Sequence, residues 1–378
     1  MSRKIGMIGL GKLGLPCLLA MEKHAGAEIY GYDISDTARQ RILDRNVDFF
    51  EEGAQDYLDS SNITLVNTAA ELFTSCDLIF VAVQTPHEKE FEGITPLGSE
   101  RRDFDYSHLR AVAKDLSEAM SIHKGLNPHI VFISTVLPGT MRREVLPILM
   151  ASNDDLRFSY NPYFIAMGTT ISDFLSPEFE LIGSLQEEDA EDLADFYADF
   201  IPGVRAEIMD IESAELAKVA YNTFIGFKIL FANSVAEITD IRGGDPDRIM
   251  SALSQASKRL MSESYLTAGM GDGGGCHPRD QIAMSWLAKE AGLSFDLFEQ
   301  IAKGRDLQTE RMAQICSDAS IKSGMQLCIL GTAYKPNTPL NIGSPVLLMQ
   351  HYLMSNNISF TEYDPFVNPG FKIDFSKD

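Results

Sequence analysis

The feature that most constrains the fold is a glycine pattern directly after a short apolar run. Residues 4–8, Lys-Ile-Gly-Met-Ile, are predicted as a buried strand, and apolar residues recur at helical spacing after residue 14. Glycines between the two would let a pyrophosphate approach the main chain and lie at the helix N-terminus, where N–H groups are unpaired. The sequence therefore predicts a dinucleotide-binding turn that contains Gly9, Gly11, Lys12, Leu13 and Gly14.

An acidic residue follows the second predicted strand of this unit. Residues 28–32, Glu-Ile-Tyr-Gly-Tyr, end in Asp33. At this distance from the glycines, a carboxylate accepts hydrogen bonds from the ribose hydroxyls of a dinucleotide. Because its charge would repel a 2′-phosphate, the sequence predicts NAD as the cofactor in preference to NADP.

The pattern then alternates between strands and helices, as in a doubly wound parallel sheet. Residues 77–83 and 129–134 are predicted as buried strands, and residues 106–122 as the helix between them. The loops after these strands would lie at the carboxyl edge of the sheet, where such folds bind ligands. We therefore expect Thr85, Pro86 and Thr135 beside the cofactor, with Thr135 near the nicotinamide. Further elements are predicted at 157–160, 187–200 and 205–209.

Residues 210–240 are predicted as one helix of about 30 residues and roughly 45 Å, because the run lacks proline and is apolar at helical spacing. Asp245 would cap the next helix and Pro246 would be its first residue. The apolar residues of the long helix exceed one narrow stripe, so we predict a homodimer or a higher oligomer through it. Lys218 and Asn222 share one face; the alternative is a surface lysine beside an unrelated asparagine.

The segment from residue 269 to 280 combines five glycines in seven residues with a thiol, a cation and a carboxylate. Pro278 suits the first turn of a helix. If Asp280 continues that helix, Cys276 lies at the positive end of the helix dipole beside His277 and Arg279, and all three effects favour a thiolate. The segment is predicted as the reaction centre. The alternative is a glycine-rich surface turn with an incidental cysteine.

The remaining chain predicts helices to about residue 318, with turns near Gly292 and Gly304, and then a small βαβ unit. Its strands are expected at 326–331 and 358–363 and its helix at 344–354. The predicted fold is therefore α/β with three domains. They comprise a Rossmann domain (residues 1–209), a central all-helical domain (residues 210–304) and a small C-terminal α/β domain (residues 305–378).

Composition excludes several classes of partner. The formal net charge of −22 argues against nucleic acid and anionic membranes as partners. No apolar run approaches the length of a membrane span. The five cysteines are odd in number and widely spaced, without a metal-binding pattern, so we expect no metal and a reducing, cytoplasmic location.

With these segments in order, the chain resembles the UDP-glucose/GDP-mannose 6-dehydrogenase family over nearly its whole length. The resemblance rests on the glycine pattern, Thr135, the Lys218/Asn222 pair, the Cys276 loop and Lys335. It implies an NAD-binding Rossmann domain, a dimer-forming central helix and a C-terminal domain that binds the nucleotide of the substrate. Members oxidise a sugar C6 alcohol to a carboxylate with two NAD, through a cysteine thiohemiacetal and thioester.

The resemblance also implies roles for particular residues. Cys276 would be the nucleophile, while Lys218, Asn222 and Asp280 would stabilise oxyanions or hold water, and Thr135 would help to position that water. Lys335 would meet the diphosphate of the substrate. Further substrate contacts are implied for Tyr163, Phe164, Tyr265, Gly269, Gly271, Gly273 and Gly274.

The chain departs from the family at the motif N-P-E-F-L-x-E-G, which appears at residues 161–168 as Asn-Pro-Tyr-Phe-Ile-Ala-Met-Gly. Both glutamates are absent, including the one thought to activate the hydrolytic water. Residues 340–345 also lack the family's Asp and Arg, and the C-terminal domain is expected to be short. Our hypothesis is that Asp280 and Thr135 hold the water while His277, or else Tyr163, assists its deprotonation. Alternatively, His277 merely caps the helix after Gly275 and points to solvent.

Three functions therefore remain open. The first is oxidation of a nucleotide sugar, with a UDP-sugar preferred, to the uronic acid. The second is oxidation that stops at the aldehyde or passes the acyl group to another acceptor. The third is a nucleotide-sugar-binding protein with little turnover.

Overall fold

The computed structural model describes residues 3–256, 269–290 and 296–369. The chain forms two compact units. The first comprises Met1–Pro86 and Phe104–Lys218, and the second comprises His87–Asp103 and Val219–Asp378. Each unit is described by itself below. The three-domain division with boundaries after residues 209 and 304 stays a prediction.

The first unit is built on an eight-stranded sheet with the order β3-β2-β1-β4-β5-β6-β7-β8. Chain order reverses at β1, which lies between β2 and β4, as in a doubly wound fold. The predicted α/β class is confirmed. One pair of neighbours, β6 and β7, is antiparallel. The strands are β1 (Lys4–Ile8), β2 (Glu28–Tyr32), β3 (Thr64–Leu65), β4 (Leu78–Val81), β5 (His129–Phe132), β6 (Phe158–Tyr160), β7 (Glu180–Ser184) and β8 (Ala206–Met209).

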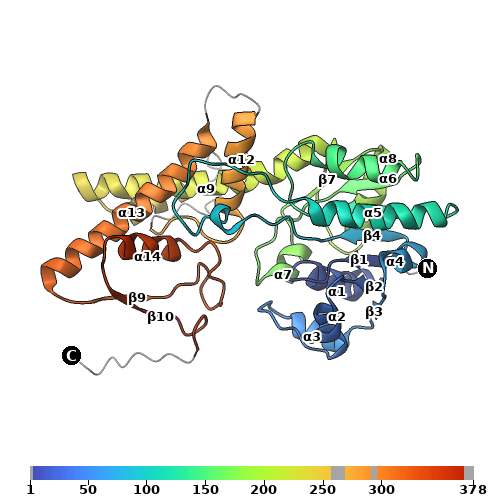
Figure 1. The fold of residues 1–378 in the computed structure, drawn as a ribbon, viewed down its shortest axis with the longest axis horizontal. Helices are drawn as coiled ribbons and strands as arrows, with labels where there is room; N and C mark the ends of the chain where they lie inside the picture. The colour runs from blue at the N-terminus through green and yellow to red at the C-terminus, as the bar shows by residue number, and fades with distance from the viewer. Residues whose placement is uncertain (1–2, 257–268, 291–295, 370–378) are drawn as a thin grey trace. The chain divides into compact units, whose positions relative to one another are not determined.

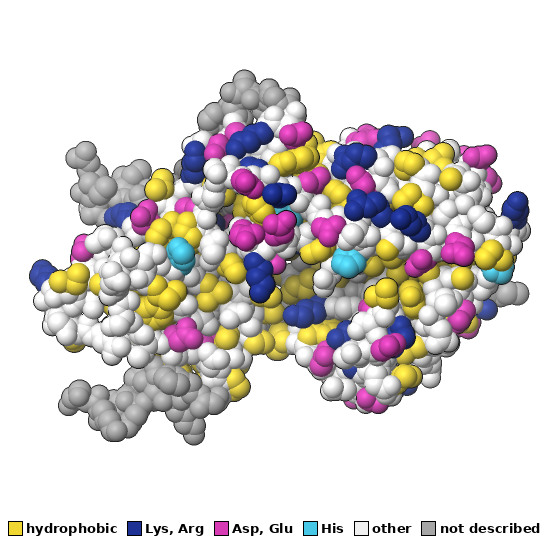
Figure 2. Space-filling model, in the orientation of Figure 1, with side chains coloured by type: hydrophobic (Ala, Val, Ile, Leu, Met, Phe, Trp, Pro, Cys, Tyr) yellow, Lys and Arg dark blue, Asp and Glu magenta, His cyan; other side chains and the backbone are white. Residues whose placement is uncertain are grey.

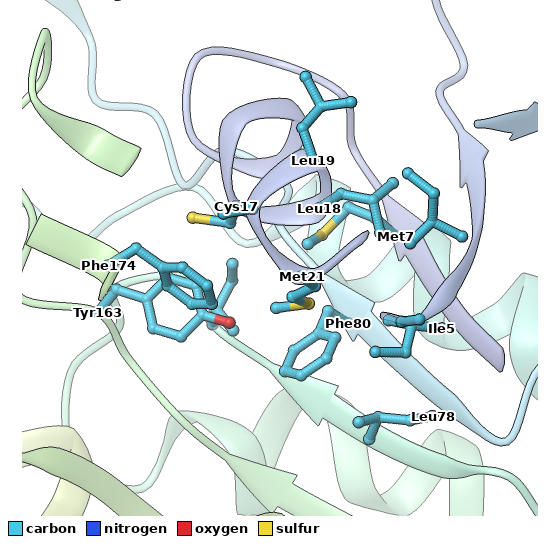
Figure 3. Packing of buried hydrophobic residues seen from close by; sticks show 14 of the residues in the cluster. Ile5, Met7, Cys17, Leu18, Leu19, Met21, Leu78, Phe80, Tyr163 and Phe174 are labelled. Atoms are coloured by element: carbon cyan, nitrogen blue, oxygen red, sulfur yellow. The ribbon is translucent and has the colours of Figure 1, made fainter. Parts of the chain in front are cut away.

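Helices surround this sheet (Figure 1). They are α1 (Gly14–Ala25), α2 (Asp36–Leu43), α3 (Ala54–Ser60), α4 (Ala69–Ser75), α5 (Ser107–Ile122), the π-helix η2 (Met141–Val145), α6 (Leu146–Met150), α7 (Thr170–Leu175) and α8 (Glu187–Ala198). One core cluster joins the sheet to α1, α2, α3, α7 and α8. Figure 3 shows Cys17 and Met21 of α1 in this cluster, with Met21 beside Phe80 of β4. Complete burial of side chains of this size stabilises the fold by about 1.5–3 kcal/mol each.

The second unit is mainly helical and ends in a small βαβ unit. Its elements are the 3₁₀ turn η1 (Lys89–Phe91), most of α9 (Ile211–Arg242), α10 (Pro246–Ser254), α12 (His277–Glu290), α13 (Leu297–Ser323), β9 (Leu327–Leu330), α14 (Pro345–Ser355) and β10 (Phe360–Tyr363). The predicted long helix is α9. As predicted, the side chain of Asp245 caps α10 through the N–H groups of Asp247 and Arg248, and Pro246 is its first residue. β9 and β10 pair in parallel, which confirms the predicted βαβ unit.

The turn predicted near Gly304 is wrong, because α13 runs through this residue without a break. A Cβ at Gly304 would lie 2.7 Å from Cδ1 of Leu230 on α9. The glycine therefore allows two helices to approach closely and does not end one. The turn predicted near Gly292 lies outside the described residues.

Residues 87–103 form a strap that leaves the first unit after Pro86 and packs within the second unit. The carbonyl oxygen of Gly93 accepts a hydrogen bond from Nη1 of Arg305 at 2.9 Å. The N–H of Leu97 donates to the carboxylate of Asp306. These two contacts fix the middle of the strap to α13. No pattern in the local sequence predicted them.

Among the described residues, no helix is long and apolar enough to cross a membrane. Figure 2 shows acidic and basic side chains interspersed over the face in view.

Candidate active site

The turn between β1 and α1 has the close packing that a dinucleotide-binding turn requires. Gly9 has φ +95°, and a Cβ there would lie 2.6 Å from the carbonyl oxygen of Ala82. A Cβ at Gly14 would overlap the carbonyl oxygen of Gly9, whereas one at Gly11 would meet open space. The first turn of α1 contains no acidic side chain. The N-terminus of α1 is thus suited to an anionic pyrophosphate. Lys12 is exposed and Leu13, the N-cap residue, is half-buried.

Asp33 stands at the end of β2 with its carboxylate beside this turn. Oδ2 accepts a hydrogen bond from the N–H of Leu10 at 2.7 Å, and Oδ1 accepts one from the N–H of Ser35 at 2.8 Å. Each carboxylate oxygen can accept a second hydrogen bond. The carboxylate is therefore fixed in orientation and still has acceptor capacity for two ribose hydroxyls. The glycine turn and Asp33 together fit the adenosine part of NAD.

The loops after β4 and β5 are tied to each other at the carboxyl edge of the sheet. Oγ1 of Thr85 donates to the carbonyl oxygen of Thr135 at 2.8 Å. Oγ of Ser134 donates to the carbonyl oxygen of Val83 at 2.6 Å. Thr85 is buried, while Thr135 and Pro86 are half-buried. The three predicted cofactor residues therefore share this edge, and their contacts with NAD stay a prediction.

Lys218 of α9 is buried and holds the loop after β6. Its Nζ donates to the carbonyl oxygen of Tyr163 at 2.8 Å and lies 4.7 Å from the centroid of the Phe164 ring. The side chain is 6% exposed. The alternative of a surface lysine is therefore wrong. An ammonium group carries three N–H donors, and one of them is bound to the Tyr163 carbonyl oxygen.

The side chain of Tyr163 lies in the core of the first unit. Its hydroxyl is 3.0 Å from that of Tyr197, which donates to Oδ1 of Asn161 at 2.6 Å. Its ring contacts that of Phe174 edge to face, as Figure 3 shows. Burial raises the pKa of the Tyr163 hydroxyl well above its usual range. The alternative in which the Tyr163 hydroxyl assists deprotonation of a water is therefore wrong. The main-chain carbonyl of Tyr163 accepts the hydrogen bond from Lys218.

Cys276 caps the N-terminus of α12 in the second unit. The N–H of Asp280 donates to the carbonyl oxygen of Cys276 at 2.8 Å, which closes the first turn. His277 is the first residue of the helix and Pro278 the second. The predicted position of the thiol at the positive end of the helix dipole is confirmed. Both Cys276 and His277 are half-buried.

Asp280 is fully buried and held from two sides. Nδ2 of Asn222 on α9 donates to Oδ2 at 2.5 Å, and Nε of Arg279 lies 3.2 Å from Oδ1. Asn222 is 5% exposed. The amide and the guanidinium compensate the buried carboxylate, which would otherwise be costly to bury. The structure thus joins Asn222, Asp280 and the Cys276 turn in one cluster.

The glycines before Cys276 are required for packing against the C-terminal part of the chain. A Cβ at Gly273 would lie 2.6 Å from Cβ of Tyr334, and one at Gly274 would lie 3.2 Å from the Tyr334 ring. Gly274 also has φ +91°. Gly271 and Gly269 have no such close neighbour. A role of these four glycines in lining the sugar stays a prediction. Tyr265, for which a substrate contact was also predicted, lies outside the described residues.

Two residues near Cys276 were not singled out from the sequence. Burial and the Cys276 thiol raise the pKa of the Tyr334 hydroxyl. Burial and the charge of Arg279 lower the pKa of His87, at the start of the strap, to about 4, although Asp280 opposes this. His87 is therefore neutral at pH 7. The sequence offered one local indication for each residue. Tyr334 directly precedes Lys335, and His87 directly follows Pro86.

Lys335 lies half-buried in the loop after β9. Asp364 organises this loop, because its Oδ2 accepts hydrogen bonds from the N–H groups of Thr332 and Ala333 at 2.7 and 2.9 Å. These and further main-chain N–H groups lower the pKa of Asp364 to about 2, although desolvation opposes them. The contact of Lys335 with a diphosphate stays a prediction.

Comparison with known proteins matches most of the chain to one family. The sequence model of the NAD binding domain of the UDP-glucose/GDP-mannose dehydrogenase family matches residues 3–201. The model of the central domain of the same family matches residues 212–304.

Individual relatives cover nearly all of this chain. UDP-glucose 6-dehydrogenase TuaD of Bacillus subtilis is 28% identical over 376 residues, which are 97% of this chain and 77% of TuaD. GDP-mannose 6-dehydrogenase of Pseudomonas syringae pv. syringae is 25% identical over 96% of this chain and 80% of its own. The structure of a UDP-glucose dehydrogenase from Pyrobaculum islandicum has a TM-score of 0.85 at 25% identity and covers 98% and 83% of the two chains.

Proposed function

Because the chain belongs to the UDP-glucose/GDP-mannose dehydrogenase family, we propose that it oxidises the C6 alcohol of a UDP-sugar to the uronic acid through a covalent adduct on Cys276. It is an NAD-dependent oxidoreductase of nucleotide sugars. The proposal adds the nucleotide, the end product and the role of the thiol to that activity.

When bound, NAD accepts a hydride, which is two electrons and one proton, from the reacting carbon in each of two oxidation steps. The chain's residues must remove the hydroxyl proton and stabilise the resulting oxygen. Lys218 and Asn222 supply N–H donors for a developing oxyanion. Thr135 would help to position the water for the last step.

Cys276 divides the oxidation into two steps. After the first, its sulfur adds to the aldehyde carbon and the carbonyl oxygen gains a proton, which gives a thiohemiacetal. The second oxidation converts this adduct to a thioester. Water then attacks the thioester carbon, the C–S bond breaks, and the thiol and the uronic acid are released. The adduct also prevents loss of a reactive aldehyde between the steps.

One observation supports this proposal above the others. Cys276 occupies the N-cap of α12, and the next turn of that helix presents Asp280, a buried carboxylate held by Asn222. The positive end of the helix dipole lies at this N-terminus, where it stabilises negative charge that develops on sulfur in the covalent step. The water for hydrolysis would be held by Asp280, with His277 as its base.

A second candidate function follows from the motif at residues 161–168. Where the family has a glutamate, this chain has Tyr163, whose side chain is in the core. Without a carboxylate there, oxidation could stop at the aldehyde, or the thioester could pass its acyl group to another acceptor. A nucleotide-sugar-binding protein with little turnover is the remaining alternative.

Counting NADH per sugar nucleotide separates these functions. A panel of UDP- and GDP-sugars should be assayed with limiting sugar and excess NAD. Two NADH per sugar support the uronic acid, one supports the aldehyde, and none supports a binding protein. Identification of the product by mass separates hydrolysis from transfer to another acceptor.

We also propose a homodimer and a reducing, cytoplasmic compartment. On α9, the stacked rings of Phe224 and Phe227 are 47% and 42% exposed, an unusual exposure for aromatic side chains. The described cysteines are free, including exposed Cys328. Free exposed thiols persist more readily in a reducing compartment.

A further inference from the structure

Glu215 of α9 is a buried carboxylate that uses both oxygens on one loop of the first unit. Oε2 accepts a hydrogen bond from the N–H of Gly139 at 2.5 Å, and Oε1 accepts one from the N–H of Met141 at 2.7 Å. Glu215 is 0% exposed. Both donors belong to the connection between β5 and α6, where the π-helix η2 begins at Met141.

This loop also carries Thr135, the residue expected near the nicotinamide. After β5, the Thr135 carbonyl oxygen accepts a hydrogen bond from Thr85. The loop then turns at Gly139, which has φ +82°, and continues into η2. Glu215 therefore fixes the far end of the loop, while Thr85 fixes its near end. Neither hydrogen bond of Glu215 is local, since its two donors precede it by 76 and 74 residues.

Lys218, three residues later on α9, makes a corresponding contact. Its Nζ donates to the carbonyl oxygen of Tyr163, in the loop after β6. Residues three apart lie on the same side of a helix. One side of α9 thus fixes two successive loops at the carboxyl edge of the sheet, with an acceptor for the first and a donor for the second.

The charges around Glu215 make its ionisation sensitive to pH near neutrality. Burial, and to a smaller extent the nearby carboxylate of Glu212, raise the pKa of Glu215, and the net value after the opposing effects is about 7. The N–H groups of Met141 and Gly139 and the charge of Arg143 lower it. Arg142, the other cation that faces this region, forms an ion pair with Glu212 at the surface.

We propose that Glu215 is a positioning residue for NAD: as a carboxylate it holds Gly139 and Met141 and so sets Thr135 at the carboxyl edge of the sheet. The proposal rests on the proposed place of Thr135 beside the nicotinamide. Protonation of either oxygen directs a hydroxyl at an N–H group, so one of the two hydrogen bonds is lost. The loop is then released at one point, and the nicotinamide end of NAD is held less well.

A glutamine at this position isolates the role of the charge. Glu215→Gln keeps the size of the side chain but offers one carbonyl acceptor, and its NH₂ group faces the other main-chain donor. Glu188→Gln is the control, because Glu188 lies on α8 of the same unit and is exposed. Hydrogen bonds to charged groups are stronger than neutral ones, so the loss should be measurable.

The first measurement is equilibrium binding of NADH by fluorescence, without sugar, between pH 6 and 8.5. For the unaltered protein and Glu188→Gln, we expect binding to weaken severalfold below pH 7. For Glu215→Gln, we expect Kd to rise about tenfold at pH 8, which corresponds to about 1.4 kcal/mol, and to change little with pH. Equal affinity and an unchanged pH dependence in Glu215→Gln would overturn the proposal.

The second measurement is amide hydrogen exchange of the peptide covering residues 134–145, corrected for the intrinsic effect of pH. In the unaltered protein we expect faster exchange at pH 6 than at pH 8. This result needs no variant, so it tests the proposal even if Glu215→Gln does not fold. Protection that is the same at both pH values would overturn the proposal.

Neither measurement requires Cys276 or a sugar. If NADH binding and loop exchange behave as expected while NADH counting gives no covalent oxidation, the proposed function fails and the positioning role of Glu215 stands. If two NADH form per sugar but the pH effects are absent, only the positioning role fails.

Discussion

Asn222 donates a hydrogen bond of 2.5 Å to the buried carboxylate of Asp280, so a residue of α9 fixes a residue of α12 one turn beyond the thiol of Cys276. The pair is fully enclosed, with Asp280 at 0% and Asn222 at 5% exposure. An amide donor neither titrates nor carries charge, so the Asn222 side chain offers the same N–H donor across the working pH range.

Replacement of the thiol should stop the reaction after its first step. In Cys276→Ser, a serine alkoxide is much harder to generate than a thiolate near neutral pH. We expect at most one NADH per sugar, formed slowly, and no adduct by intact-mass analysis. Cys328→Ser, at an exposed thiol of β9, should behave as the unaltered enzyme. Two NADH per sugar at the normal rate in Cys276→Ser would exclude the nucleophilic role.

Asp33 should determine the choice between NAD and NADP. Asp33→Asn removes the charge that repels a 2′-phosphate and one acceptor for the ribose hydroxyls. We expect the ratio of kcat/KM for NAD to that for NADP to fall at least about tenfold, or about 1.4 kcal/mol. Asp36→Asn is the control, since the Asp36 side chain is 93% exposed and pairs with Arg39. Equal use of both cofactors by the unaltered enzyme would remove the basis of this prediction.

His277 is the proposed base for thioester hydrolysis. A positioned general base contributes about 10²–10⁴-fold to a rate. In His277→Ala we expect a burst of close to two NADH per active site, followed by a steady rate at least about tenfold lower. Intact mass during the burst should show the acyl adduct on Cys276. His108→Ala, at an exposed histidine of α5, is the control. If burst and steady rate are both normal in His277→Ala, another group activates the water.

The exposed aromatic pair of α9 should lie in the homodimer interface. Phe227→Glu introduces a charge where an apolar contact is expected. We expect light scattering at micromolar concentration to show a dimer for the unaltered protein and a monomer for Phe227→Glu. Ile122→Glu, at a side chain of the first unit that is 66% exposed, should remain dimeric. A monomeric unaltered protein would contradict the prediction directly.

Glu180 should make the folded state less stable as pH rises. Burial raises its pKa to about 8, while the amide of Asn161 opposes this shift. Between about pH 4.5 and 8 the folded chain retains a proton that the unfolded chain releases, so the free energy of unfolding falls through this window and then levels off. Glu180→Gln should remove up to about 4 kcal/mol of this decrease, measured by urea unfolding at pH 5 and 9. Exposed Glu178→Gln should leave it intact.

Features that depend on neighbouring residues were predictable from the sequence. The glycine turn, the Asp245 cap, the long helix and the N-terminal position of Cys276 on α12 all follow from local spacing and local hydrogen bonds. Gly304 misled the prediction because the reason for this glycine is Leu230, on a helix distant in sequence.

The site was predictable only in part, for the same reason. Resemblance aligned Tyr163 with one of the two absent glutamates, but the structure pairs its hydroxyl with Tyr197, which no local pattern indicates. Glu215 carried no signal beyond its position on a helix, since its partners are main-chain N–H groups. Main-chain partners leave no trace in side-chain patterns, so only the folded structure could show them.

The strap of residues 87–103 has a consequence for how the protein is made. Leu97 leaves the ribosome 209 residues before its partner Asp306. At ordinary rates of synthesis the strap would wait roughly 10–40 s for α13, while the sheet strands on either side of it are already available to pair. The second unit is therefore not a continuous stretch of chain. A fragment of residues 219–378 would lack the carbonyl that Arg305 binds, and it should be produced together with a peptide of the strap if it is to be studied alone.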